Sequence, residues 1–362
     1  MENQYLTDIL KEYGIYEQDV EEISPFGNGH INSTFKVVAN GNIYILQKIN
    51  HYVFKNPIRL MDNMVAVTSF IREKVERFGG DSSRATITIL KTLKGKNLVV
   101  TKDREYYRLQ HCIDGTTLDF ADDDTLYTVG ETFGKFQNIL SDFPAYTLFE
   151  VIPHFHDTPR RYDDLITAIN VDIKSRATFI QEEINYAVSR KNYISKIVEG
   201  MNNGSIPLRV THNDTKLNNV LLDTETLEGV CVIDLDTIMP GSYLYDYGDA
   251  LRFAASTADE DETDLSKVKF DMDKFKAFTK GYLLQTKNKL KKSEIDLMAY
   301  SVELMTYECG IRFLTDYLNG DVYFKISREE HNLDRARAQF ALARDINRKL
   351  PEMQKIIYEY AK

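Results

Sequence analysis

The sequence predicts an α+β fold made of two lobes, a small strand-rich N-terminal lobe and a larger, mainly helical C-terminal lobe. Residues 34–39 and 43–49 are β-rich runs that flank Asn40-Gly41. An Asn-Gly pair favours the tight turn of a β-hairpin, because both of its positions need a positive φ. Beyond residue 114, apolar residues recur at helical spacing instead. The length of 362 residues also fits two lobes better than one domain of about 150 residues.

The N-terminal lobe, residues 1–113, is expected to combine a sheet with one main helix. The apolar pattern of residues 5–13 predicts a short helix that ends before a glycine. A long helix is predicted over residues 57–78, because Pro57 stands at its start and Gly79-Gly80 follows its end. Further strands are predicted at residues 23–26, 86–90, 98–101 and 106–113.

The C-terminal lobe, residues 114–362, is expected to follow a linker near residues 111–118. A short β-like island at residues 210–236 interrupts its helical pattern. Because clefts between lobes are common ligand sites, the linker is where we expect a ligand to bind. Helices are predicted at residues 123–140, 161–169, 182–201, 267–287, 292–318 and 327–360.

Composition excludes several classes of protein. Hydrophobic residues make up 43% of the chain and charged residues 28%, which is ordinary for a soluble globular protein. The net charge of −10 argues against a general nucleic-acid binder. Cys112, Cys231 and Cys309 form no CxxC pair, so they are expected to be free thiols. With neither a signal peptide nor an apolar run of about 18–20 residues, the protein is expected to be cytoplasmic and to have no membrane partner.

The most informative segment contains His212-x-Asp214-x-x-x-x-Asn219, followed by Asp234 fifteen residues after Asn219. That interval has room for a strand, a turn and a return strand. Transfer of a phosphoryl group needs a base for the acceptor hydroxyl and metal ions for the phosphate charge. An Asp can accept the hydroxyl proton, and Asn and Asp oxygens suit Mg²⁺. The pattern therefore predicts a phosphoryl-transfer site.

These motifs resemble the superfamily of aminoglycoside phosphotransferases and choline kinases, which shares the bilobal protein-kinase fold. Within it, the likeness is greatest to the N-acetylhexosamine 1-kinases and runs from about residue 24 to about residue 340. The resemblance implies ATP-dependent phosphorylation of the anomeric hydroxyl of N-acetylglucosamine or N-acetylgalactosamine, with Mg²⁺ as cofactor. The segments that carry the resemblance are residues 29–32, 44–47, 154–159, 212–219, 233–242 and 308–314.

The resemblance also implies roles for individual residues. Asp214 matches the catalytic base that faces the sugar hydroxyl. Asn219 and Asp234 match the Mg²⁺ ligands. Asp236 is expected either to be a further metal ligand or to lie behind these ligands and support them. Two residues are expected to be structural, namely His212 and Asp246, the latter matching a buried Asp that braces the catalytic loop.

The glycine-rich loop departs from the family pattern. Gly27-x-Gly29 lacks a third glycine, because the equivalent position is Asn32. A dinucleotide-binding fingerprint is excluded, since a hairpin follows rather than a helix. The chain has no GxxxxGK[ST] sequence, so it is not a P-loop kinase. A loop that covers phosphates stays plausible, because small side chains let backbone N–H groups approach them.

The strand lysine of kinases is also replaced. Gln47 stands where that lysine is expected, and Lys48 points to the other face of the strand unless a bulge turns it. We infer that Lys216, two residues after Asp214, handles part of the phosphate charge. ATP is expected to bind near the hinge through His111 and Ile113.

Three residues are predicted to bind the sugar besides Asp214, namely His30, Arg312 and, more weakly, Tyr317. Their side chains can bracket sugar hydroxyls with directional hydrogen bonds. The segment 154–157 contains His-x-His, which binds zinc in some hydrolases, but no second histidine cluster accompanies it. We expect this segment to begin a helix or to line the substrate site instead.

Other functions stay open from the sequence. A kinase of choline, of an aminoglycoside or of another sugar would carry the same motifs. A choline site favours an aromatic cage, for which this chain has Tyr but no Trp. A non-catalytic pseudokinase that binds nucleotide or sugar is the alternative outside enzymes. The sequence decides neither the oligomeric state nor the choice between the two N-acetylhexosamines.

Overall fold

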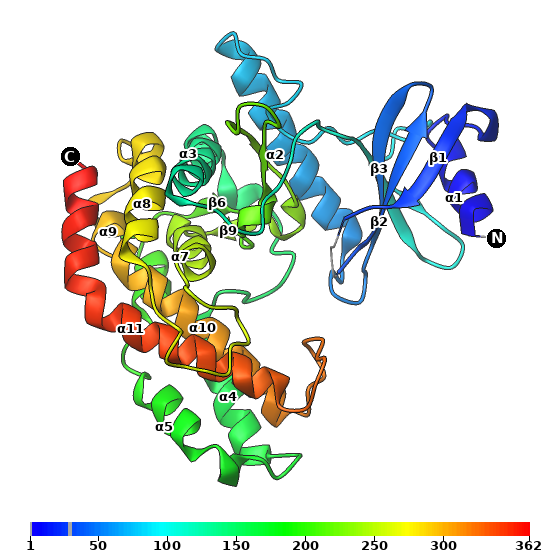
Figure 1. Cartoon of the computed structure of the whole chain (residues 1–362). Helices are drawn as coiled ribbons and strands as arrows, with labels where there is room; N and C mark the ends of the chain where they lie inside the picture. Colours follow the sequence, from blue (N-terminus) through cyan, green and yellow to red (C-terminus); the bar gives the residue numbers. More distant parts are fainter. Residues whose placement is uncertain (1, 28–30) are drawn as a thin grey trace. The chain divides into compact units, whose positions relative to one another are not determined.

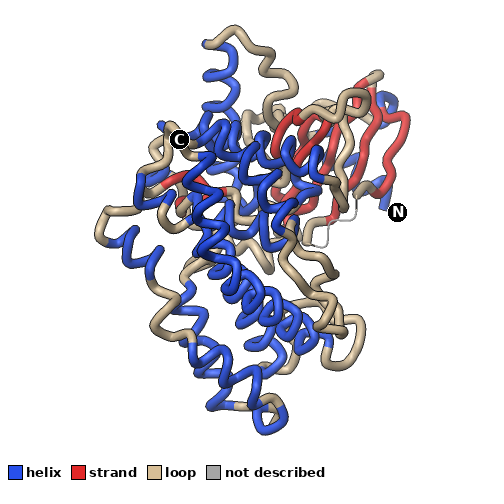
Figure 2. Tube along the Cα trace, turned by 60° about the vertical axis from the view of Figure 1, so that its left-hand side comes forward, coloured by secondary structure: helices blue, strands red, loops and turns tan. Residues whose placement is uncertain are grey.

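A computed structural model describes residues 2–27 and 31–362, with the backbone alone at residues 2 and 3. The chain divides into two compact units. Unit 1 is Met1–Thr116, Asp142–Pro153 and Leu221–Pro240, and unit 2 is Thr117–Ser141, His154–Val220 and Gly241–Lys362. Figures 1 and 2 show the long strands gathered in the N-terminal part of the chain and helices making up most of the remainder. This composition of the two parts confirms the predicted α+β class.

Unit 1 holds a five-stranded antiparallel sheet with the order β1-β2-β3-β5-β4. The predicted hairpin is confirmed, with Asn40 and Gly41 at φ 51° and 69°. The strand predicted at residues 86–90 is wrong, because only an isolated bridge joins Ile89 to Gln110. The strands are β1 (Val20–Pro25), β2 (Ser33–Ala39), β3 (Asn42–Ile49), β4 (Val99–Val100) and β5 (Tyr106–His111).

Two helices accompany this sheet within unit 1. Helix α1 (Glu2–Lys11) buries Leu6 and Leu10 in one apolar cluster with sheet residues such as Leu46. Helix α2 (Pro57–Arg77) begins as predicted, since Pro57 lies in its first turn and the Asn56 side chain accepts the N–H of Arg59 at 3.2 Å. Helix α2 also contacts the short turn that follows β8, which carries an acidic motif.

Unit 2 is built around helix α10, which contacts α4, α7 and α11, while α3 packs on α8. Two predicted helices are each divided. Residues 182–201 form α5 and α6, because a polar turn separates them, and residues 292–318 form α9 and α10. The helices are α3 (Asp123–Ile139), α4 (Thr158–Val171), α5 (Gln181–Ser189), α6 (Lys196–Asn202), α7 (Tyr243–Ala254), α8 (Met272–Thr286), α9 (Lys292–Ile295), α10 (Met298–Leu318) and α11 (His331–Tyr360).

Short strands occupy the predicted β-like island. They are β6 (Arg209–Thr211), β7 (Val220–Leu222), β8 (Gly229–Val232) and β9 (Met239–Gly241). Strands β7 and β8 pair as a hairpin, so the predicted strand, turn and return strand after Asn219 are confirmed. Among the residues that the structure describes, no helix has the length and apolar character needed to cross a membrane.

Candidate functional site

The loop that carries Asp214 follows β6 and is braced from helix α7. Asp246 accepts the backbone N–H groups of His212 and Asn213 at 2.9 and 2.8 Å. The backbone carbonyl of Asp246 accepts the hydroxyl of Thr215 at 2.7 Å. Asn213 has a positive φ of 65°, which turns the chain sharply just before Asp214. The backbone on both sides of Asp214 is therefore tied to one buried carboxylate.

Asp246 is itself held in place within unit 2. Burial raises the pKa of its carboxyl, and the electrostatic interaction with His212 and the donated hydrogen bonds oppose that increase. One of these donors is the side-chain amide of Gln137 at 2.9 Å. Helix α7 lies close against α10 because Gly248 has no side chain: a Cβ there would lie 2.4 Å from the carbonyl oxygen of Ser301.

His212 is buried beneath the same loop. Its ring meets Phe133 and Phe136 edge-on, with centroids 6.1 and 6.2 Å apart. Its Nδ1 accepts the backbone N–H of Asp214 at 3.3 Å. These contacts place His212 where it shapes the loop from below.

Asp214 is partly exposed and has two polar neighbours. The Nζ of Lys216 lies 3.2 Å from its carboxylate, with 44% of the Lys216 side chain and 31% of the Asp214 side chain exposed. Burial lowers the pKa of Lys216, but the charge and hydrogen bond of Asp214 together with the charge of Asp249 outweigh burial. The net shift of the pKa is upward, so Lys216 stays an ammonium. The side-chain amide nitrogen of Asn219 donates to the backbone oxygen of Asp214 at 2.7 Å. The Oδ1 atom of Asn219 remains available to accept a hydrogen bond or to bind a cation.

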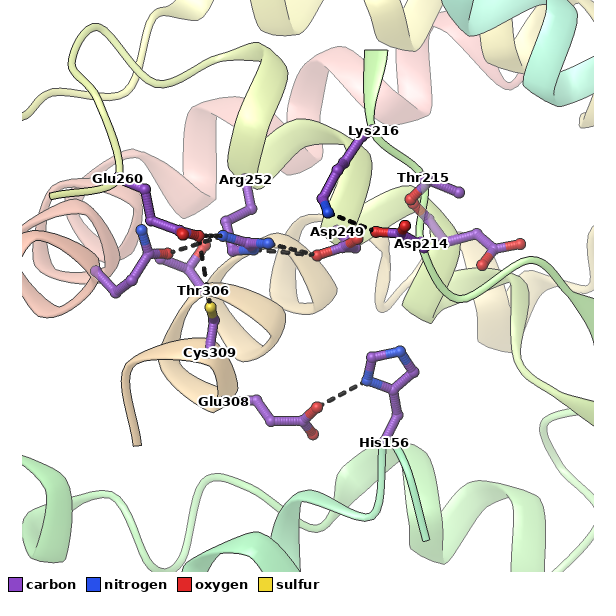
Figure 3. A network of polar contacts seen from close by, with 12 residues as sticks. His156, Asp214, Thr215, Lys216, Asp249, Arg252, Glu260, Thr306, Glu308 and Cys309 are labelled. Atoms are coloured by element: carbon purple, nitrogen blue, oxygen red, sulfur yellow. Dashed lines mark hydrogen bonds and ion pairs between the residues drawn. The ribbon is translucent and has the colours of Figure 1, made fainter. Parts of the chain in front are cut away.

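A chain of alternating charges extends from this pair (Figure 3). Asp249 on α7 accepts the Nε–H of Arg252 at 3.1 Å, and Arg252 also pairs with Glu260 at 2.9 Å. Burial by itself raises the pKa of Asp249, but Arg252, His156 and Lys216 bring it below its ordinary value. Asp249 is therefore a buried carboxylate that stays ionised close to Lys216.

Unit 1 carries the two carboxylates of the second acidic motif, which follow β8. Asp234 is exposed and has left-handed backbone angles, φ 57° and ψ 59°. That conformation is costly for a residue other than glycine and is often kept at functional sites. Asp236 is buried, and its two oxygens accept hydrogen bonds from Arg108 and from Asn32. The two carboxylates thus stand in different environments.

The register of β3 shows which residue stands where other kinases have their strand lysine. The pairing of β3 with β2 and with β5 is continuous through Gln47 and Lys48, so no bulge turns Lys48. Lys48 pairs with Glu105 at 2.9 Å. Gln47 lies opposite Arg108 in the register, and its Oε1 accepts the Nε–H and Nη2–H of that arginine at 2.9 and 2.7 Å. A buried guanidinium therefore adjoins Gln47.

The remaining nucleotide-site predictions lie in or beside unit 1. Gly27 has φ 75°, a conformation that favours glycine. Gly29 and His30 lie outside the described residues. His111 is the exposed last residue of β5, and Ile113 follows it by two positions.

The two residues predicted to bind sugar from α10 have different partners. The guanidinium of Arg312 lies over the rings of Phe155 and Phe324, at 5.0 and 5.6 Å. Tyr317 is buried beneath the guanidinium of Arg176 at 4.2 Å, and burial raises the pKa of its phenol. The structure therefore places Arg312 against the 154–157 segment and Tyr317 apart from that contact.

The 154–157 segment begins a helix, as predicted. The side chain of Asp157 accepts the N–H of Arg160 at 3.2 Å, and Pro159 lies in the first turn of α4. Across residues 2–27 and 31–362, no group of three or more His, Cys, Asp or Glu side chains could hold a metal ion.

Two buried charged residues with specific partners, Arg108 and Glu308, received no role from the sequence. Arg108 is 1% exposed, and its signal was a lone arginine between apolar residues of a predicted strand. Glu308 is also 1% exposed and contacts His156. Its signal was one of three acidic residues, with Glu303 and Asp316, in a helix that is apolar on most faces.

Comparison with known proteins identifies relatives. The model of the phosphotransferase enzyme family matches residues 22–278, well over half of the chain. The chain is similar in structure to a microcompartment-associated aminopropanol kinase, with 15% identity, TM-score 0.62 and coverage of 97% of this chain and 98% of the other.

Two further solved structures show the same likeness. An aminoglycoside phosphotransferase from Alicyclobacillus acidocaldarius has 12% identity and TM-score 0.63, with coverage of 97% and 96%. A choline kinase from Cryptosporidium parvum has 15% identity and TM-score 0.60, with coverage of 98% and 97%. Together with the family match, these likenesses confirm the predicted fold of aminoglycoside phosphotransferases.

Proposed function

Because the chain belongs to the phosphotransferase enzyme family, we propose that it is an ATP- and Mg²⁺-dependent kinase that phosphorylates the anomeric hydroxyl of N-acetylhexosamines. The observation that carries this proposal is the loop of Asp214, a partly exposed carboxylate on a backbone that Asp246 braces on both sides. The choice of N-acetylhexosamines is supported by the motif resemblance of residues 212–219 and 233–242.

Asp214 accepts the proton of the sugar hydroxyl as that oxygen attacks the γ-phosphorus of ATP, while the bond from this phosphorus to the bridging oxygen breaks and ADP leaves. Its backbone is fixed, so the carboxylate needs little rearrangement before reaction, and catalysis comes mainly from positioning. Lys216 contacts Asp214 and keeps its positive charge, which favours the phosphate oxygens of the nucleotide.

The residues proposed as Mg²⁺ ligands offer the hard oxygens that this ion prefers. In Asn219 the amide nitrogen is engaged with Asp214, so Oδ1 is the oxygen directed to a cation. Asp234 offers an exposed carboxylate. When bound, Mg²⁺ supplies positive charge against the phosphates. Asp236 already accepts hydrogen bonds at both oxygens, so we assign it the role of holding Arg108.

Nucleotide binding is assigned to unit 1. Gly27 lets the backbone approach phosphate, and the chain at His111 and Ile113 offers backbone groups to the adenine. Gln47 contributes through Arg108, whose guanidinium it fixes. Lys48 is the weakest member of this set, because it pairs with Glu105 on the other face of β3.

The test is a panel of acceptors incubated with ATP and Mg²⁺. The panel holds both N-acetylhexosamines, glucose, choline, ethanolamine, aminopropanol and an aminoglycoside, with a reaction lacking Mg²⁺ as control. We expect ³¹P NMR to show one new phosphomonoester whose phosphorus couples to the anomeric proton of an N-acetylhexosamine. Phosphate on a non-anomeric oxygen, or transfer only to an amino alcohol, would refute the proposal.

A further inference from the structure

His156 lies just before α4 and is held by a buried carboxylate. Its side chain is 5% exposed, and its Nδ1 lies 2.7 Å from Glu308 on α10. The other oxygen of Glu308 accepts the hydroxyl of Thr158 at 2.5 Å. Glu308 therefore uses both oxygens to position the start of α4 and the ring of His156.

The contact with Glu308 determines which ring nitrogen carries hydrogen. Burial raises the pKa of Glu308. The charge of His156 and the hydrogen bonds from His156 and Thr158 together lower it by more, so the net shift of the pKa is downward. An ionised carboxylate can only accept, so Nδ1 of His156 is the donor. Nε2 is the atom left to face other groups.

Nε2 is buried and has no hydrogen-bond partner among the residues that the structure describes. The ring cannot turn to find one, because Nδ1 is held and aromatic rings cover it. The ring of Phe155 lies 4.5 Å away and that of Tyr245 5.1 Å away, centroid to centroid. A buried polar atom without a partner is unfavourable and calls for a group that satisfies it.

His156 is close to the Asp214 loop within unit 2. Its charge lowers the pKa of Asp249, and Lys216, which contacts Asp214, acts on the same carboxylate. Figure 3 shows one ring nitrogen of His156 toward Glu308 and the other on the side where Asp249 and Asp214 are drawn. The unsatisfied atom is thus drawn on the side of His156 that faces Asp214, the proposed base.

We propose that Nε2 of His156 binds a hydroxyl group of the acceptor, with Glu308 and Thr158 holding the ring in position. This inference rests on the proposed function and deepens it. A hydroxyl both donates and accepts, so it pairs with Nε2 in either protonation state, whereas a quaternary ammonium can do neither. His156 therefore selects hydroxyl-rich acceptors over choline-like ones.

The test is His156→Asn, whose side-chain amide keeps a donor near the position of Nδ1 but has no atom at Nε2. We expect the KM for N-acetylglucosamine to rise about tenfold, the loss for one hydrogen bond, while the KM for ATP changes less than twofold. The matched control is His154→Asn in the same segment, where the side chain is half exposed. Asn tolerates the positive φ of that position, and both KM values are expected to stay unchanged.

Deoxy analogues of the sugar then identify the contacted hydroxyl. Removal of that hydroxyl is expected to weaken binding to the wild type but to have little further effect in H156N. An unchanged sugar KM in a folded, less stable H156N would show a histidine that only supports the fold and would overturn the proposal. If H156N does not fold, ¹⁵N NMR of histidine-labelled wild type decides: sugar is expected to shift the His156 Nε2 resonance, assigned by its loss in His156→Gln, and an unmoved resonance overturns the proposal.

Failure of the proposed function is separately visible. If the wild type ignores N-acetylhexosamines and phosphorylates another alcohol of the panel, the substrate assignment fails. The same comparison of wild type, H156N and deoxy analogues, run with that alcohol, still decides the role of His156.

Discussion

Arg108 and Asp236 form an ion pair in the interior of unit 1, with 2% and 5% of their side chains exposed. The same guanidinium donates to Gln47, and Asn32 donates to the other oxygen of Asp236. Arg108 therefore joins the strand position of the missing kinase lysine to the second acidic motif. Hydrogen bonds on several sides compensate the cost of burying both charges.

Asp236→Asn is expected to destabilise the protein by about 3–5 kcal/mol, because it leaves the Arg108 charge buried and uncompensated. Urea unfolding of the variant measures this loss. The matched control is Lys48→Gln, which breaks the partly exposed pair with Glu105 next to Gln47 and is expected to cost about 0–1 kcal/mol. Equal effects of the two substitutions would contradict a special role for the buried pair.

Asp214→Asn is expected to lower kcat by about 10²–10⁴-fold, because the amide cannot accept the hydroxyl proton. ATP affinity and the melting temperature should change little, since Asp246 and Asn219 hold the loop through its backbone. Turnover assays measure the loss of kcat, and calorimetry with ATP measures the affinity for the nucleotide. Asp163→Asn, an exposed carboxylate on α4, is the control. Full activity in D214N would refute the assignment of the base.

Lys216→Ala is expected to lower turnover about tenfold and to raise the KM for ATP, because the loop loses a cation that contacts Asp214. Lys216→Arg should recover part of the activity, since it keeps the charge. Steady-state kinetics with varied ATP measure both effects. Alanine substitution of Lys267, an exposed lysine elsewhere in unit 2, serves as control. Unchanged kinetics in K216A would remove Lys216 from the mechanism.

Glu308→Gln is expected to make the stability of the protein depend less on pH in the acidic range. The folded-state pKa of Glu308 lies below its ordinary value of 4.5, so its contribution to stability is complete above about pH 4.5 and is lost as the pH falls through the lower folded pKa. Thermal melts of wild type and E308Q between pH 3 and pH 7 measure the difference. A difference that stays constant over this range would show that Glu308 does not titrate with folding.

Local chemistry made part of the fold predictable. Asn40-Gly41 specifies its turn through the φ angles that both residues accept, and Pro57 marks the start of α2 because it lacks an N–H. Helix α7 was missed for an equally physical reason. Asp246, Asp249 and Arg252 recur at helical spacing, but all ten residues from Tyr243 to Arg252 are buried. These polar residues therefore mark no solvent-exposed face of the kind by which a surface helix is identified.

The family pattern can be recognised in the sequence, because His212, Asp214 and Asn219 lie within eight residues and one loop can hold them all. The partners of the buried charges, in contrast, become visible in the folded chain. Arg108 meets Asp236 across 128 positions, and His156 meets Glu308 across 152. Such pairings depend on how strands and helices pack, and no local pattern of residues encodes which distant carboxylate a buried cation will reach.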